Sequence, residues 1–234
     1  MTAAPRAILF DLDETLYLER RFALSGFAAV ARAIAADAGL PAGAIFARLS
    51  AALRRGERAV AFQHLCSALG WPESRVERLV DIYRSHAPNL RLPRRTRQTL
   101  DALRPEWRIG IVTNGPVGIQ AAKVDTLGVE PLVDTVVYAS CCGLGGGKPS
   151  PEPFVTAARR LGVMLSRCVF VGDDPRCDIG GARRVGMKTI RIRQGVHGRA
   201  WLAGYEEADA VTTSLLDVPR LSAGLLGETE SLCA

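Results

Sequence analysis

The alternation of short apolar runs with helical patterns is the feature that most limits the fold of this 234-residue chain. Such an alternation is typical of a parallel sheet covered by helices on both faces, so we predict an α/β fold. The strand-like runs lie near Ala7, Ile109, Thr135, Val169, Thr189 and Ala210, and Pro151–Leu161 is one of the helical segments. Ligands of such sheets bind beyond the carboxyl ends of the strands, where Asp11, Thr113 and Asp173 fall.

The connection between the first two strands is much longer than a single crossover helix requires. It runs from Leu16 to about Pro93, whereas a crossover needs little more than one helix of about a dozen residues. Helical spacing of apolar residues occurs in four segments of it, Phe22–Ala38, Ala42–Arg55, Val60–Leu69 and Glu73–Ser85. We therefore predict a separate helical domain of residues 16–94, inserted into a core of residues 1–15 and 95–234. Its connections, near residues 16–20 and 86–94, are expected to act as hinges.

The first strand-like run, Ala7–Phe10, is followed by the acids of the segment DLDET, residues 11–15. Asp11 and Asp13 lie two residues apart and can converge on one pocket where the chain begins to turn. Carboxylates that close repel each other in a partly dry site, so a hard, oxygen-bound cation is the simplest candidate to lie between them. An Asp after a strand can also shape a turn or cap a helix.

The second strand-like segment, Arg108–Val112, leads into Thr113, Asn114 and Gly115 before a helix that begins near Pro116. A hydroxyl group and free backbone amides at a strand end and a helix start form a seat for phosphate. Thr113 or Asn114 could also simply cap the helix. Both interpretations can hold together.

Lys148 follows the glycine-rich run CCGLGGG, residues 141–147, and is followed by Pro149. A nucleotide-binding P-loop is excluded, because Cys142 stands where that motif requires glycine and because proline follows the lysine. What remains is a flexible loop that delivers one of only three lysines in the chain. A point charge on a flexible stem suits the neutralisation of a phosphate or a carboxylate.

A further apolar run near Val169 leads through Gly172 into Asp173 and Asp174, and Asp178 follows at the start of a helix. The small residues of this helix allow a close approach of the backbone. Asp178 alone could be an acid that the helix dipole favours. The helix dipole does not explain the adjacent pair Asp173 and Asp174.

These four motifs, in this order and each after a hydrophobic strand, resemble those of the haloacid dehalogenase-like (HAD) superfamily. They are Asp-x-Asp-x-Thr, Thr-Asn-Gly, Lys-Pro and Gly-Asp-Asp-x-x-x-Asp, and the resemblance covers essentially the whole chain. It implies a Rossmann-like core, in which the inserted helices form a helical-bundle cap of the C1 type that carries much of the substrate selectivity. The segments DETLY and TNG look closest to the nucleotidase and N-acylneuraminate-9-phosphatase branch.

The resemblance also implies roles for the acidic residues. Asp11 would be the nucleophile, and Asp13 would protonate the leaving oxygen and later take a proton from water. Mg²⁺ would be held by an Asp11 carboxylate oxygen, the Asp13 backbone carbonyl and Asp173. Asp174 and Asp178 are expected to surround these metal ligands without binding the ion themselves.

The remaining motif residues are expected to bind the substrate. Thr113 and the backbone amides of Asn114 and Gly115 would hold the phosphoryl oxygens. Lys148 would stabilise the charge that develops there and anchor the nearby acids. Tyr17, just after the catalytic loop, is expected to line the entrance to the site.

Asp13 favours a phosphatase over a dehalogenase, because the alkoxide that leaves a phosphate monoester needs a proton and a halide does not. We expect an Mg²⁺-dependent phosphatase that acts on a small soluble metabolite, either a nucleotide or a sugar phosphate. A phosphosugar mutase, which uses the same acid, and a non-catalytic HAD-like binding protein are the alternatives. A signalling receiver domain fits less well, because it gives the long insertion no role.

The net charge of +6 and the pI near 9.3 raise the question of nucleic-acid binding. The densest basic cluster lacks interleaved aromatic residues, so a solvated face is the better interpretation of Arg91, Arg94, Arg95 and Arg97. We expect no nucleic-acid or membrane partner, since no segment approaches the ~20 apolar residues of a membrane span. The N-terminus lacks a signal-peptide pattern and the six cysteines match neither a zinc nor a disulfide pattern, so we expect a cytoplasmic monomer or homodimer.

Overall fold

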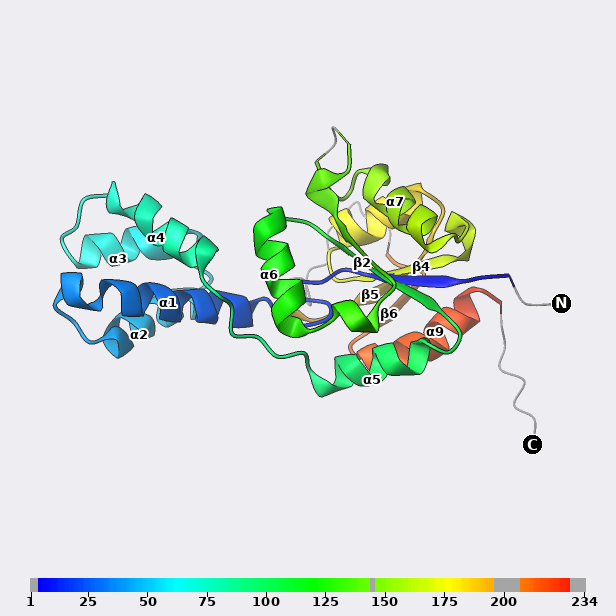
Figure 1. Ribbon diagram of the computed structural model, residues 1–234, viewed down its shortest axis with the longest axis horizontal. Helices are drawn as coiled ribbons and strands as arrows, with labels where there is room; N and C mark the ends of the chain where they lie inside the picture. The colour runs from blue at the N-terminus through cyan, green and yellow to red at the C-terminus, as the bar shows by residue number, and fades with distance from the viewer. Residues whose placement is uncertain (1–3, 144–145, 196–206, 228–234) are drawn as a thin grey trace. The chain divides into compact units, whose positions relative to one another are not determined.

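The computed structural model describes residues 4–143, 146–195 and 207–227. The chain divides into two compact units, Arg20–Leu90 and the segments on either side of it. The larger unit contains a six-stranded parallel sheet of order β3-β2-β1-β4-β5-β6 (Figure 1). Its strands are β1 (Ala7–Phe10), β2 (Arg108–Thr113), β3 (Thr135–Tyr138), β4 (Cys168–Gly172), β5 (Lys188–Ile192) and β6 (Ala210–Thr212). The predicted strands are confirmed.

Helices cover both faces of this sheet, as the α/β prediction requires (Figure 1). They are α5 (Arg94–Leu103), α6 (Val117–Leu127), α7 (Pro151–Leu161), α8 (Gly180–Arg184) and α9 (Val218–Leu225). Helices α7 and α8 contact each other, and α5 contacts α9. Ala7 and Leu9 share a core cluster with Phe154 of α7, while Ile8 and Phe10 point to the opposite face because side chains alternate along a strand.

The smaller unit is built from four helices, α1 (Arg20–Ala38), α2 (Ala42–Arg54), α3 (Ala61–Ala68) and α4 (Arg75–Ser85). The four predicted helical segments are confirmed to within two residues at each end. Their apolar faces form one core that includes Phe27, Ile34, Ile45, Leu49, Leu65 and Leu79. Gly39 and Gly70 adopt positive φ angles of +59° and +66° just after α1 and α3, which lets the chain turn where a side chain would be strained.

The boundaries of the helical unit differ from the predicted residues 16 and 94 by four residues at each end. Residues 16–19 and 91–94 belong to the larger unit. Leu16 is buried, and its carbonyl accepts a hydrogen bond of 2.7 Å from the Thr96 hydroxyl of α5. This contact ties the first connection to the sheet-bearing unit. The function of the helical unit as a cap, and of its connections as hinges, stays a prediction.

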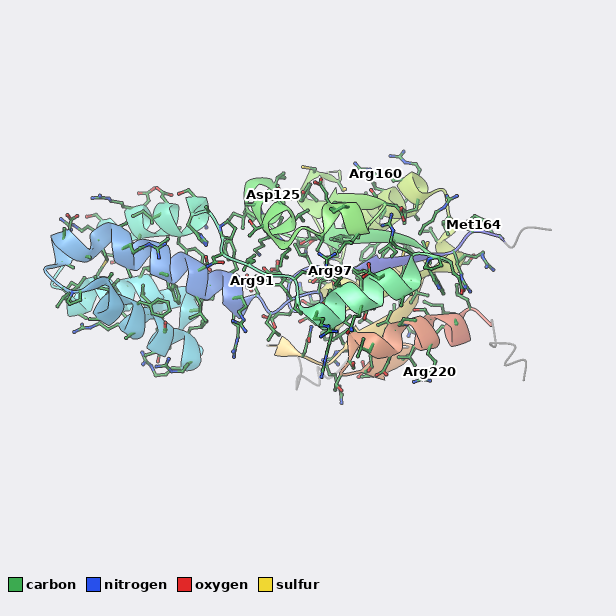
Figure 2. The ribbon with its side chains drawn as sticks, turned by 60° about the horizontal axis from the view of Figure 1, so that its bottom comes forward. Arg91, Arg97, Asp125, Arg160, Met164 and Arg220 are labelled. Carbon is green, nitrogen blue, oxygen red and sulfur yellow. The ribbon has the colours of Figure 1, made fainter. Side chains whose placement is uncertain are left out.

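The basic cluster at residues 91–97 lies on the surface. Arg91, Arg94, Arg95 and Arg97 are all exposed, and Figure 2 labels the first and the last of them. Across the described parts of the chain, no helix combines the length and the apolar character that crossing a membrane requires.

Two helical glycines of the larger unit provide a test of its packing. A Cβ atom on Gly181 would lie 2.7 Å from the Phe154 ring and 3.1 Å from Pro149 Cα, whereas one on Gly118 would meet nothing within 4 Å. We predict that Gly181→Ala lowers the free energy of unfolding by about 1–3 kcal/mol through overpacking. Gly118→Ala should raise it by about 0.4–1 kcal/mol, because alanine restricts the unfolded chain. Urea unfolding measures both, and equal effects of the same sign would contradict the described packing of α8.

Candidate active site

The carboxyl ends of three neighbouring strands bring most of the predicted site residues together. Strand β1 lies between β2 and β4, and Phe10 is in register with both Ile111 and Val171. The residues that follow these positions therefore meet at one edge of the sheet. A cavity of about 170 Å³ lies there, lined by Asp11, Asp13, Glu14, Glu19, Asn114, Lys148, Asp173, Asp174, Cys177 and Asp178.

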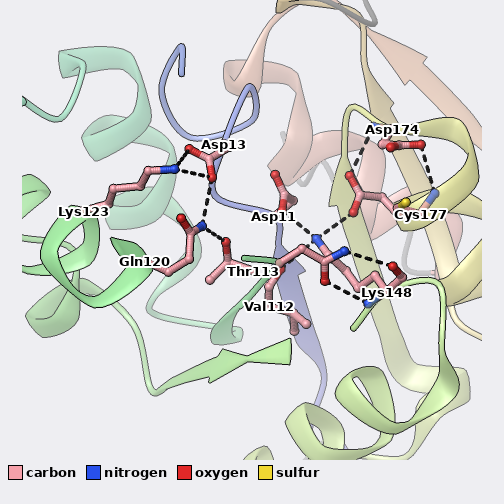
Figure 3. Close-up of polar contacts among 11 residues, drawn as sticks. Asp11, Asp13, Val112, Thr113, Gln120, Lys123, Lys148, Asp174 and Cys177 are labelled. Carbon is pink, nitrogen blue, oxygen red and sulfur yellow. Dashed lines mark hydrogen bonds and ion pairs between the residues drawn. The ribbon is translucent and has the colours of Figure 1, made fainter. Parts of the chain in front are cut away.

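Lys148 lies at the centre of the buried part of the site (Figure 3). Its side chain is only 2% exposed, and its Nζ lies 2.5 Å from Asp11 Oδ1 and 2.7 Å from Asp178 Oδ1. The same ammonium group donates a hydrogen bond of 2.9 Å to the carbonyl of Val112 on β2. One lysine thus joins the ends of two strands and the segment after β4.

The charges of this cluster shift the titration of its members. Burial raises the pKa of the Asp11 carboxyl well above its ordinary value, the Lys148 ammonium opposes this rise, and the charges of Asp178 and Asp13 add to it. Burial acts to lower the pKa of Lys148, but the carboxylates of Asp11 and Asp178 outweigh that effect and raise it. Lys148 is therefore a cation, and the site still contains more carboxylates than positive charges.

Three of these carboxylates have the arrangement of a site for a divalent cation. One oxygen each of Asp11, Asp173 and Asp178 lie within 4.8 Å of one another, and all three residues are buried. Carboxylate oxygens are the ligands that Mg²⁺ prefers, and a cation would relieve the excess negative charge, so the residues fit such an ion. The side chain of Asp13 is not part of this group, and its predicted contribution comes from its backbone carbonyl.

Asp178 lies beside Lys148, within the buried group of carboxylates. It falls in a short π-helical turn, Pro175–Ile179, and its Oδ2 accepts a hydrogen bond of 3.1 Å from the Asp174 amide. Gly172 makes room for it, because a Cβ atom there would lie 2.3 Å from Asp178 Oδ2. Asp174 also lines the cavity, and its Oδ1 accepts hydrogen bonds from the amides of Arg176 and Cys177, so it supports the loop.

The predicted phosphate seat follows β2. Thr113 is buried, and its Oγ accepts a hydrogen bond from Gln120 Nε2. The Asn114 side chain binds both backbone groups of Lys148, accepting from its N–H at 2.8 Å and donating to its carbonyl at 2.9 Å. Gly115, with φ of +123°, starts the turn into α6. The Asn114 side chain is thus occupied in holding Lys148, which leaves its backbone amide as the group for the predicted role.

Asp13 lies at the other side of the site, and Figure 3 shows Lys123 and Gln120 bound to it. Lys123 Nζ is 2.8 Å from both of its oxygens, and Gln120 Nε2 is 2.9 Å from Oδ2. Tyr17 donates from its hydroxyl to Oδ1 at 2.5 Å. Burial and the negative charge of Asp13 raise the pKa of the Tyr17 hydroxyl, which therefore stays neutral and able to donate.

The predicted position of Tyr17 is wrong. Tyr17 was expected at the entrance, but it is only 3% exposed and is not among the described residues that line the cavity.

Gln120 and Lys123 were not singled out from the sequence. Two signals could have found them: Lys123 is one of three lysines, and the two lie three residues apart, on one face of the helix that follows the phosphate seat.

Known proteins share the sequence of this chain over most of its length. A family model described as haloacid dehalogenase-like hydrolase matches residues 5–186. Phosphoglycolate phosphatase of Xanthomonas campestris is 34% identical over 199 residues, which cover 82% of this chain and 84% of that protein. Glyceraldehyde 3-phosphate phosphatase of Methanopyrus kandleri is 43% identical over 89 residues, but these cover only 38% of this chain and 37% of that protein.

The fold agrees as well. The crystal structure of a 2-haloacid dehalogenase from Pseudomonas syringae pv. Tomato aligns with a TM-score of 0.64 and 26% identity, over 94% of this chain and 99% of that one. The family model covers well over half of the chain. The chain therefore belongs to the haloacid dehalogenase-like hydrolase family.

Proposed function

We propose that this hydrolase is a phosphatase that cleaves phosphate monoesters of small metabolites in two steps, through an aspartyl-phosphate on Asp11. The observation that carries the proposal is the buried Asp11 carboxylate, bound by Lys148 and followed two residues later by a second carboxylate. The relatives named above, phosphatases of phosphoglycolate and glyceraldehyde 3-phosphate, support a small phosphorylated substrate. Nucleotides and sugar phosphates remain in the proposed substrate class.

Asp11 acts as the nucleophile in the first step. Its carboxylate attacks phosphorus while the bond from phosphorus to the leaving oxygen breaks, so that one difficult displacement becomes two easier ones. The hydrogen bond from Lys148 to Oδ1 holds the carboxylate in a fixed orientation. Thr113 and the amides of Asn114 and Gly115 receive the phosphoryl oxygens, and the Lys148 ammonium stabilises the charge on them.

The acidic cluster supplies the site for Mg²⁺. Asp11, Asp173 and the Asp13 backbone carbonyl would hold the ion, and Asp178 lies within the same group of carboxylates. When bound, Mg²⁺ neutralises the charges of the nucleophile and the phosphate, which otherwise repel each other. Lys148, which binds both Asp11 and Asp178, contributes a further positive charge to this neutralisation.

Asp13 is the proposed acid and base. It enters the first step as a carboxylic acid and gives its proton to the leaving alkoxide, and the carboxylate that results takes a proton from the attacking water in the second step. This role is what separates phosphate ester hydrolysis from dehalogenation, because a halide leaves without a proton. The helical unit Arg20–Leu90, inserted directly after this loop, is the proposed substrate-selecting cap.

We predict that Asp11→Asn abolishes phosphate release. The amide is not nucleophilic, so kcat should fall by more than about 10³-fold on every substrate. The measurement is release of inorganic phosphate from para-nitrophenyl phosphate, phosphoglycolate, glyceraldehyde 3-phosphate, nucleotides and sugar phosphates, with Mg²⁺ present. The variant should also form no acid-stable phosphate bound to the protein with any of these substrates.

The matched control is Asp125→Asn, which makes the same chemical change at an exposed position of α6 (Figure 2). It should leave turnover unchanged. Turnover by folded Asp11→Asn would overturn the proposed nucleophile. Absence of hydrolysis by the wild type, together with phosphoryl transfer between sugar phosphates, would point to a mutase instead.

We further predict that Mg²⁺ stabilises the folded protein through the acidic cluster. An ion that binds only the folded state raises the free energy of unfolding by about 2.7 kcal/mol when its free concentration is a hundred times its Kd. Thermal unfolding with and without Mg²⁺ measures this as a rise in Tm. Asp173→Asn should remove most of the rise, whereas Asp125→Asn should keep it. A Mg²⁺-induced rise that survives in Asp173→Asn would place the ion elsewhere.

A further inference from the structure

Two buried polar residues of α6, Gln120 and Lys123, face the catalytic loop. Lys123 is 3% exposed and Gln120 is 2% exposed, although both side chains are polar and one is charged. Lysine is almost never fully buried unless it is paired, because moving an ammonium group out of water is costly. The burial of Lys123 therefore needs a specific partner.

That partner is Asp13. Lys123 Nζ lies 2.8 Å from each Asp13 oxygen, while Glu19 Oε1 lies farther away at 3.8 Å. Gln120 approaches Oδ2 and Tyr17 approaches Oδ1, so donors reach both oxygens of the carboxylate. We call Tyr17, Gln120 and Lys123 the Asp13 cradle.

The cradle also joins Asp13 to the phosphate seat. Gln120 Nε2 contacts both Asp13 Oδ2 and Thr113 Oγ, and helix α6 begins three residues before Gln120, directly after the seat. The position of the carboxylate is thus set by the element that also carries the seat. A displacement of about 1 Å in a reacting group can reduce a rate by about 10²-fold, so this coupling matters for proton transfer.

We infer that Lys123, together with Gln120 and Tyr17, is a positioning residue that orients the Asp13 carboxyl group toward the leaving oxygen. The inference rests on the proposed function, because it assumes that Asp13 delivers a proton there. It assigns no contact between Lys123 and the substrate. A lysine that only holds α6 in place, or only attracts anionic substrates, would affect all phosphate esters alike.

The test compares two classes of phosphate ester. An alkyl phosphate has a strongly basic leaving oxygen that needs a proton, whereas para-nitrophenyl phosphate releases a weakly basic oxide that does not. The ratio kcat/KM reports events up to the first irreversible step, which includes departure of the leaving group. We expect Lys123→Met to lower kcat/KM for the alkyl ester by about 10²-fold and to change that for the aryl ester little.

Controls separate this inference from the proposed function. Lys188→Met, at the exposed start of β5, removes another of the three lysines and should change neither value. Asp13→Asn should show the same selective loss as Lys123→Met. If Asp13→Asn affects both esters alike, the proposed acid is wrong. If Asp13→Asn is selective and Lys123→Met is not, the positioning role alone is overturned.

A variant that keeps the charge balance covers the case in which Lys123→Met does not fold. Tyr17→Phe removes one donor to Asp13 Oδ1 and leaves the ring in place. It should show a smaller loss that is again selective for the alkyl ester. Equal losses for the two esters in folded Tyr17→Phe would overturn the cradle.

Discussion

The buried ammonium group of Lys148 is the contact on which the site depends. It lies between two carboxylates, Asp11 and Asp178, and also binds the Val112 carbonyl at the end of β2. Removing one member of a buried ion pair leaves an uncompensated charge, which costs about 3–5 kcal/mol. The three strand ends are therefore held together by charge as well as by the sheet. The carboxylates still outnumber the cations, so the same arrangement that stabilises the loops also favours a bound metal ion.

The two aspartates of the catalytic loop pair with different lysines. Asp11 and Asp13 are separated by one residue, yet each has its own lysine, Lys148 for the first and Lys123 for the second. The two lysines reach the site from different segments, the loop before α7 and the face of α6. Two carboxylates with separate surroundings can carry out different tasks, which the proposed roles of nucleophile and acid require.

Local patterns explain what the sequence could predict. The strands, the four helices of the inserted unit and the acids after β1 and β4 follow from apolar periodicity and from the rule that ligands bind at strand ends. Gln120 and Lys123 were missed because their contact with Asp13 depends on how α6 is rotated against those ends. The contact of Asp178 with Gly172 could not be predicted, because it depends on a π-helical turn. The edge of the helical unit was misplaced because a long-range contact with Thr96 holds Leu16.

The way in which Asn114 holds Lys148 places a demand on the residue before the lysine. One side chain from the end of β2 binds both backbone groups of Lys148. A Cβ atom on Gly147 would lie 2.9 Å from Asn114 Oδ1, and the φ angle of Gly147 is +123°, which residues with a side chain rarely adopt. A larger residue at position 147 would therefore displace the Asn114 side chain, and with it the ammonium group that binds Asp11 and Asp178.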